Sequence, residues 1–223
     1  RLHGPHIREA AFADLRAIAA LKAGQIENWL NERQSDTEVL AGAEGLAIHA
    51  QRLILNGNAD SRGYVVNRLK TFAKAWDFES ALLDVSGQVV VSTKEWGAVT
   101  TQVRQLLSAA LSSGQAQRSD LYRDAAGHVH LDYVIPLPGS GGNRRTAAVL
   151  LHAPVDGFLF PLIQTWPTPS ASAETLLVRR DGDQVLFLNE LRHHHKTALT
   201  FRLPLDNPNI PAVAAVRSGT AQV

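Results

Sequence analysis

The stretch FESALLDVSGQVVVST, residues 78–93, decides the fold. Its two halves are rich in β-branched and other apolar residues, and a polar turn, Asp84–Val85–Ser86–Gly87, separates them. Residues 78–84 and 88–93 therefore predict two antiparallel strands. The hydrophobic period changes here from that of a helix to that of a strand, so the sheet begins at this hairpin.

The part of the chain before the hairpin predicts helices. Residues 7–55 contain no proline, and good helix formers dominate them. One apolar stripe recurs at helical spacing and consists of Phe12, Leu15, Ala19, Ile26 and Leu30. Residues 35–37, Ser-Asp-Thr, are typical of a cap that restarts a second helical piece. After a turn at residues 56–60, Val65, Leu69 and Phe72 predict another helix.

The part after the hairpin predicts a helix over 100–113 and then three antiparallel strands. Residues 119–123 and 128–136 form a second hairpin around the turn at 124–127. Residues 145–153 are apolar on both faces, which predicts a central strand. Helix, hairpin, helix and three strands is an order that resembles a PAS-like α/β module, with a five-stranded antiparallel sheet and helices against it.

A second, shorter module is predicted near the C-terminus. Residues 155–166 form an apolar, partly helical connector that Pro167–Ser170 breaks. Strands over 175–179 and 184–189, an extended segment over 197–203 and a helix over 209–216 follow. The hairpin at 177–187 resembles that at 81–91, with Gln184 in the place of Gln88. This similarity indicates a duplicated module.

The two modules differ in length. The first spans residues 78–154, whereas residues 174–223 leave no room for a last hairpin and strand. We expect the second module to be incomplete. Either the chain was cut within the module, or some of its residues are not described, or the module is degenerate. The predicted domains are a helical spine over 1–59, a PAS-like module over 60–154, and a connector with a partial module over 155–223.

Composition excludes several classes of protein. Lys and Arg number 22 against 21 Asp and Glu in 223 residues, a net charge of +1, so we expect no nucleic-acid partner. Cysteine is absent, which excludes a disulfide scaffold, a thiol nucleophile and Cys-ligated metals. We find neither a signal peptide nor a membrane-spanning run. Because the chain starts at Arg1 instead of Met, we expect a processed form or part of a longer protein.

Three stretches resemble the double Cache region of bacterial membrane receptors, namely histidine kinases, diguanylate cyclases and chemoreceptors. WLNERQSDTEVLA, residues 29–41, resembles the first long helix of that family. Residues 81–93 resemble its first strand pair. FPLIQTWPTPS at 160–170, followed by ETLLVRRDG at 174–182 and FLNELR at 187–192, resembles the entry to its second module.

The resemblance implies an outward-facing sensor in a membrane-anchored parent protein, at the periplasmic or extracellular side of the inner membrane. Since no catalytic motif occurs in the sequence, we expect that the fragment is not an enzyme and needs no cofactor. A small-molecule ligand would lie in the membrane-distal module, residues 60–154, between the sheet and its covering loops. The long N-terminal helix would transmit the change, and its apolar stripe would form a homodimer or pack on its own sheet. Amino-acid-binding members carry an aromatic and arginine cluster ahead of the third strand, which residues 117–124 match poorly, so amino-acid binding is not carried over.

The strand at 128–136 supplies the main candidate site. His128, His130 and Asp132 alternate with apolar residues and share one face. This face either meets water or lines a pocket in which Asp132 accepts a hydrogen bond from an amine and His130 donates or accepts one. The candidate ligand-binding residues are Asp132, His130, Tyr122, Tyr133, His152, Arg68 and Trp96.

Two alternatives remain at this stage. A metal-dependent hydrolase would use His193, His195 and Glu190, or His130 and Asp132, although a cluster at a loop edge explains the three adjacent histidines 193–195 better. A structural dimerisation module would bind no ligand and would have a small or filled pocket. No known catalytic motif supports the hydrolase.

Overall fold

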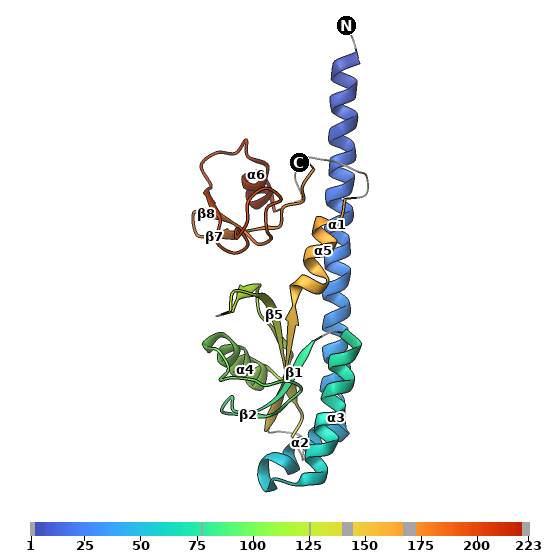
Figure 1. Cartoon of the computed structure of the whole chain (residues 1–223), viewed down its shortest axis with the longest axis vertical. Coiled ribbons are helices and arrows are strands. Elements are labelled where there is room, and N and C mark those ends of the chain that lie inside the picture. The colour runs from blue at the N-terminus through green and yellow to red at the C-terminus, as the bar shows by residue number, and fades with distance from the viewer. Residues whose placement is uncertain (1–2, 77, 125, 140–144, 167–172, 220–223) are drawn as a thin grey trace. The chain divides into compact units, whose positions relative to one another are not determined.

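The computed structural model describes residues 3–76, 78–124, 126–139, 145–166 and 173–219. The chain forms two compact units, one over Asn31–Val155 and one that combines Arg1–Leu30 with Asp156–Val223. As predicted, it is a mixed α/β protein with a long N-terminal helix and two antiparallel sheets (Figure 1).

The N-terminal helices are longer and more continuous than expected. Helix α1 spans His3–Ala41, α2 spans Glu44–Asn56 and α3 spans Ala59–Trp76. The predicted restart at residues 35–37 is wrong. The hydroxyl of Ser35 donates to the Asn31 carbonyl at 3.1 Å and that of Thr37 to the Gln34 carbonyl at 2.6 Å, so both serve the preceding turn of α1 and neither caps a new helix. The break lies instead at Gly42 and Ala43.

The turn predicted at residues 56–60 is confirmed. Gly57 adopts a left-handed conformation with φ of 61°, and its N–H donates to the Leu53 carbonyl at 2.9 Å. Only a residue without a side chain adopts this conformation readily. Asn58 Oδ1 then accepts from the Ser61 N–H at 2.7 Å and so satisfies a free donor at the start of α3.

The larger sheet lies in the Asn31–Val155 unit. Its strands are β1 (Glu79–Asp84), β2 (Val89–Ser92), β3 (Gln117–Arg118), β4 (Tyr122–Arg123), β5 (Val129–Leu137) and β6 (Ala147–Pro154). The order is β2-β1-β6-β5-β3, and β4 also pairs with β5. Of the predicted strand at 119–123, only the end forms a strand, β4, while β3 lies just before the predicted range. The strand β6 is central as predicted.

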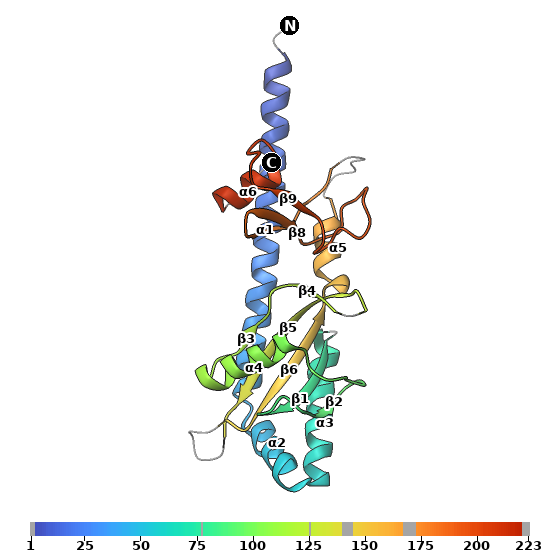
Figure 2. The same cartoon turned by 90° about the vertical axis from the view of Figure 1, so that its left-hand side faces the viewer.

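Helices cover both faces of this sheet. Helix α4 (Thr101–Ser113) packs its apolar side on Leu83, Val134 and Leu150, and Figure 2 shows α4 in front of the sheet. Helices α2 and α3 cover the opposite face. Every residue of β5 is buried, so the alternative that the face of His130 and Asp132 meets water is wrong.

The other unit contains a smaller sheet and the connector. The connector forms the short 3-10 helix η1 (Val155–Gly157) and α5 (Leu159–Gln164), and the ammonium of Lys22 on α1 donates to the carbonyls of Leu162 and Thr165. The predicted break at 167–170 lies outside the described residues. Strands β7 (Val178–Asp181), β8 (Gln184–Phe187) and β9 (Arg202–Pro204) form a sheet that packs on α6 (Pro211–Ser218). None of the helices described is long and apolar enough to cross a bilayer.

Candidate functional site

A buried carboxylate joins three strands on the α4 face of the sheet. Asp132 on β5 lies opposite His152 on β6, and its Oδ1 is 2.6 Å from His152 Nδ1. Tyr122 on the edge strand β4 donates its hydroxyl to Asp132 Oδ2 at 2.6 Å. The Asp132 side chain is completely buried. A buried carboxylate is stable only when such partners replace its hydration.

The backbone also holds Asp132 in place. Its N–H donates to the hydroxyl of Ser119, and its carbonyl accepts from the Ser119 N–H, both at 2.9 Å. Burial raises the pKa of Tyr122, and the negative charge of Asp132 raises it further. Tyr122 therefore remains a hydrogen-bond donor throughout the physiological range of pH.

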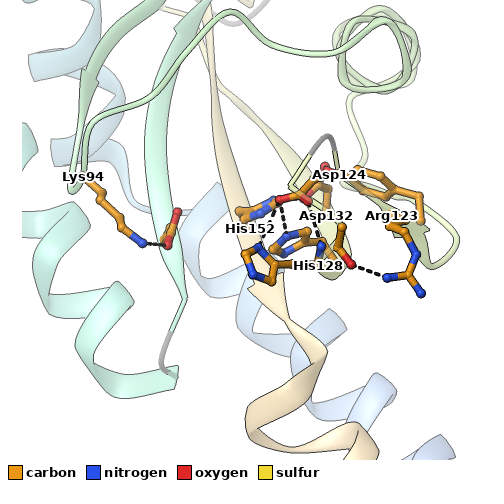
Figure 3. Close-up of polar contacts among 10 residues, drawn as sticks. Lys94, Arg123, Asp124, His128, Asp132 and His152 are labelled. Atoms are coloured by element: carbon orange, nitrogen blue, oxygen red, sulfur yellow. Dashed lines mark hydrogen bonds and ion pairs between the residues drawn. The ribbon is translucent and has the colours of Figure 1, made fainter. Parts of the chain in front are cut away.

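A second histidine–carboxylate pair lies beside the first. The rings of His130 and His152 are in contact, with centroids 3.8 Å apart and planes tilted by 31°, and His130 Nε2 lies 2.9 Å from Asp124 Oδ2. Burial lowers the pKa of His130, and the neighbouring His152 lowers it further, against the opposite effect of Asp124. Burial alone would raise the pKa of Asp124, but hydrogen bonds from the His128 N–H and from His130 outweigh it and lower that pKa. Figure 3 shows these contacts as dashed lines.

A pocket of about 210 Å³ opens over this network. Its floor includes Leu150 and His152 of β6, and the loop before α4 forms another side. Four carboxyl groups line the pocket, and none of the lining residues within the described part of the chain is Lys or Arg. The carboxyl groups belong to Glu79, Glu95, Asp124 and Asp132.

The loop and the start of α4 close the pocket beside Trp96. The indole of Trp96 meets His152 edge to face, with ring centroids 5.5 Å apart. Thr100 caps α4, and its side-chain oxygen accepts from the Val103 N–H at 3.2 Å. Trp96, Thr100 and Val103 all line the pocket, so the segment that begins α4 also forms part of the site.

The structure brings together most of the candidate residues. Asp132, Tyr122, His152 and Trp96 line the pocket, and the ring of His130 contacts that of His152 next to them. Tyr133 does not belong to this group, because successive side chains of a strand point to opposite faces. Arg68 lies on α3 over the ring of Phe72, with its guanidinium carbon 4.9 Å from the ring centroid, and does not line the pocket either.

Sequence reasoning missed the acidic character of the site. Glu79 is opposite His152 in the β1–β6 register, and Asp124 precedes the turn to β5. Neither residue could be recognised as part of the site without knowing which strands pair. The alternative set around residues 193–195 lies in the other unit, where the three histidines are exposed and Glu190 accepts from the Thr197 N–H at 2.8 Å. In the described residues they form no metal-ligand cluster.

Comparisons with known proteins establish the fold. No protein-family model matches the sequence, and no curated protein sequence matches it. The ligand-binding domain of the Pseudomonas fluorescens chemoreceptor CtaA in complex with L-isoleucine is similar in structure, with a TM-score of 0.52 and 16% identity, over 89% of this chain and 75% of that one. The ligand-binding domain of the Pseudomonas aeruginosa PAO1 amino acid chemoreceptor PctC in complex with GABA has a TM-score of 0.55 and 16% identity, over 86% and 80% of the two chains.

A histidine kinase provides a third similar structure. The sensor domain of Vibrio cholerae DctB has a TM-score of 0.55 and 11% identity over 73% of this chain, which spans 61% of that domain. The chain thus has the fold of extracytoplasmic sensor domains of the Cache type, as the resemblance indicated. The similar solved structures are sensor and ligand-binding domains rather than catalytic ones.

Proposed function

We propose that this chain is the extracytoplasmic ligand-sensing domain of a transmembrane signalling receptor, and that the pocket on the α4 face binds a small organic cation. Two observations support the proposal. The fold is that of solved ligand-binding domains of chemoreceptors. The pocket combines a buried, hydrogen-bonded carboxylate with an aromatic wall, an arrangement typical of small-molecule sites.

The charge of the lining favours a cation, and this observation carries the proposal. Four carboxyl groups face the pocket, and no Lys or Arg of the described chain lines it. Lys94, which does not line the pocket, pairs with Glu79, and the N-terminus of α4 contributes about half a positive charge. Together they balance fewer than two of the four carboxylates, so the lining keeps a net negative charge. An ammonium group would donate hydrogen bonds to the exposed Glu95 or to Glu79, which also pairs with Lys94, and the face of Trp96 would add a cation–π contact.

The described lining contains no arginine, and this limits which kind of cation fits the pocket. L-Isoleucine and GABA, named with the two chemoreceptor domains, each carry an ammonium and a carboxylate group. Among the residues that the structure describes, the pocket lining offers acceptors for an ammonium but no bidentate arginine partner for a carboxylate. Its volume of about 210 Å³ is below the ~300 Å³ at which drug-sized sites begin. A small amine without a carboxylate fits these properties best.

The wider receptor is part of the same proposal. The parent protein is anchored in the membrane, and the module over 60–154 is its membrane-distal part. Ligand binding would shift the population of two arrangements of the domain, and α1 would transmit this shift toward the membrane. The apolar stripe of α1, in which Phe12 is 45% exposed, would form a homodimer.

One observation favours a ligand-free module instead. Both oxygens of Asp132 already have partners, Tyr122 and His152, so the network is satisfied without a ligand. In that case the pocket would be a by-product of the sheet and α4, and the domain would serve dimerisation alone.

The test is a calorimetric and thermal-shift screen of the chain against small amines, amino acids and organic acids, with EDTA present. We expect an amine to bind, and a ligand at one hundred times its Kd would stabilise the fold by about 2.7 kcal/mol. Glu95→Gln removes an exposed carboxylate of the lining and should weaken binding several-fold, whereas Glu38→Gln on α1 should not. Binding of organic acids only, or of no compound in the screen, would refute the proposal, and the second result would favour the ligand-free module.

A further inference from the structure

The hairpin that joins β4 to β5 gathers two imidazoles and a carboxylate. Asp124 Oδ2 lies 2.9 Å from His130 Nε2 and 3.7 Å from His128 Nδ1. One potential ligand atom from each of these residues lies within 4.8 Å of the other two. Among the residues that the structure describes, no other set of three carboxylates or histidines is so close.

These separations suit a tetrahedral metal site. Bonds of 2.0–2.1 Å to zinc place neighbouring ligand atoms about 3.3 Å apart, and the two distances above are on either side of this value. The His128 side chain is 65% exposed, so its ring is free to rotate toward an ion. The buried His130 would need little movement.

The backbone of the turn positions Asp124 for this purpose. Its Oδ1 accepts from the His128 N–H at 2.8 Å, while its own N–H donates to the His128 carbonyl at 2.9 Å. Gly127, with φ of 92°, closes the turn. One carboxylate oxygen therefore fixes the hairpin, and the other oxygen faces the two histidines.

His130 is the buried histidine of the cluster. It is 7% exposed, and its Nδ1 has no hydrogen-bond partner among the described residues. A buried nitrogen of this kind costs free energy. Nε2, which faces Asp124, is the nitrogen that would bind the ion, and the neutral imidazole would then carry its proton on Nδ1.

We propose that Asp124, His128 and His130 bind one divalent transition-metal ion, with zinc as the best match to two imidazoles and a carboxylate. Three protein ligands leave a fourth position open to water or to a ligand. Because Asp124 also lines the pocket, this position borders it. The metal site shares Asp124 with the proposed amine pocket, but its zinc titration does not depend on amine binding.

The experiment is a calorimetric titration of the EDTA-stripped, dialysed full chain with Zn²⁺, followed by a Co²⁺ titration monitored by visible absorption. We expect one Zn²⁺ per chain at this site and the intense Co²⁺ bands of a tetrahedral complex. His128→Ala alters an exposed side chain and should weaken Zn²⁺ binding by at least about tenfold. The double variant His193→Ala/His195→Ala should bind as the wild type does.

Two results would overturn the proposal. One is wild-type Zn²⁺ affinity in His128→Ala, and the other is loss of the Zn²⁺ signal in the His193→Ala/His195→Ala variant. His130→Gln provides a second check, with circular dichroism to confirm folding. Since the amine screen contains EDTA, failure of either proposal leaves the other intact.

Discussion

Asp132 and His152 are cross-strand neighbours on β5 and β6, and His152 Nδ1 lies 2.6 Å from Oδ1 of the completely buried Asp132 carboxylate. The other oxygen accepts from Tyr122, so one side chain connects the edge of the sheet to its central strand. Stability and the candidate site therefore depend on the same group.

Asp132→Ala should destabilise the domain strongly. The change removes the completely buried carboxylate and leaves the partly buried Tyr122 Oη and His152 Nδ1 without their acceptor. Loss of one member of a buried pair costs about 3 kcal/mol. Urea unfolding would measure the loss. Asp132→Asn retains an acceptor for Tyr122 and should cost clearly less. Equal stability of Asp132→Ala and the wild type would show that water replaces the carboxylate.

Tyr122→Phe should lower the free energy of unfolding by about 2 kcal/mol, because it removes a hydrogen bond to a charged acceptor. The same urea titration measures the effect. Tyr64→Phe is the matched control, since Tyr64 is 42% exposed on α3, and it should change stability by less than about 0.5 kcal/mol. Similar losses in both variants would contradict the role of the Tyr122 hydroxyl.

Thr100→Ala should cost about 1 kcal/mol through loss of the cap of α4. Its neighbour Thr101 is exposed and does not cap the helix, so Thr101→Ala serves as the control. Thermal unfolding of both variants, followed by circular dichroism, measures the difference. If the two variants melt at the same temperature, the hydrogen bond from the Val103 N–H contributes nothing to stability.

Asp84 should make the domain sensitive to acid. Burial acts to raise its pKa, but hydrogen bonds from Ser86, Gln88 and Gly87 outweigh it, so the folded pKa lies below the ordinary value. Such a group stabilises the fold fully above its unfolded pKa of about 3.9. The contribution is then lost as the pH falls through the lower folded pKa.

The measurement for Asp84 compares unfolding of the wild type and Asp84→Asn between pH 7 and pH 2. The wild type should be more stable by a constant amount at neutral pH, and the difference should shrink as the acid titrates Asp84. A difference that persists unchanged at the lowest pH would mean that the turn does not depend on the charge of Asp84.

Local patterns predicted most of the architecture. The hairpin at β1 and β2, helix α4 and the central position of β6 follow from hydrophobic period and from apolar residues on both faces, which act over short distances along the chain. The restart at 35–37 was predicted wrongly because Ser, Asp and Thr cap helices at their ends but also bond back to the preceding turn within a helix. Which of the two occurs depends on the residues that pack around the helix.

By itself, the sequence determined the order of the elements and the shared face of His130 and Asp132, since alternation along a strand is a local property. Only the tertiary structure decided that this face is buried, that Glu79 and Asp124 join Asp132 in one acidic pocket, and that Asp124 reaches His128 and His130. These contacts depend on strand register and on the packing of α4, through which residues far apart in the chain become neighbours.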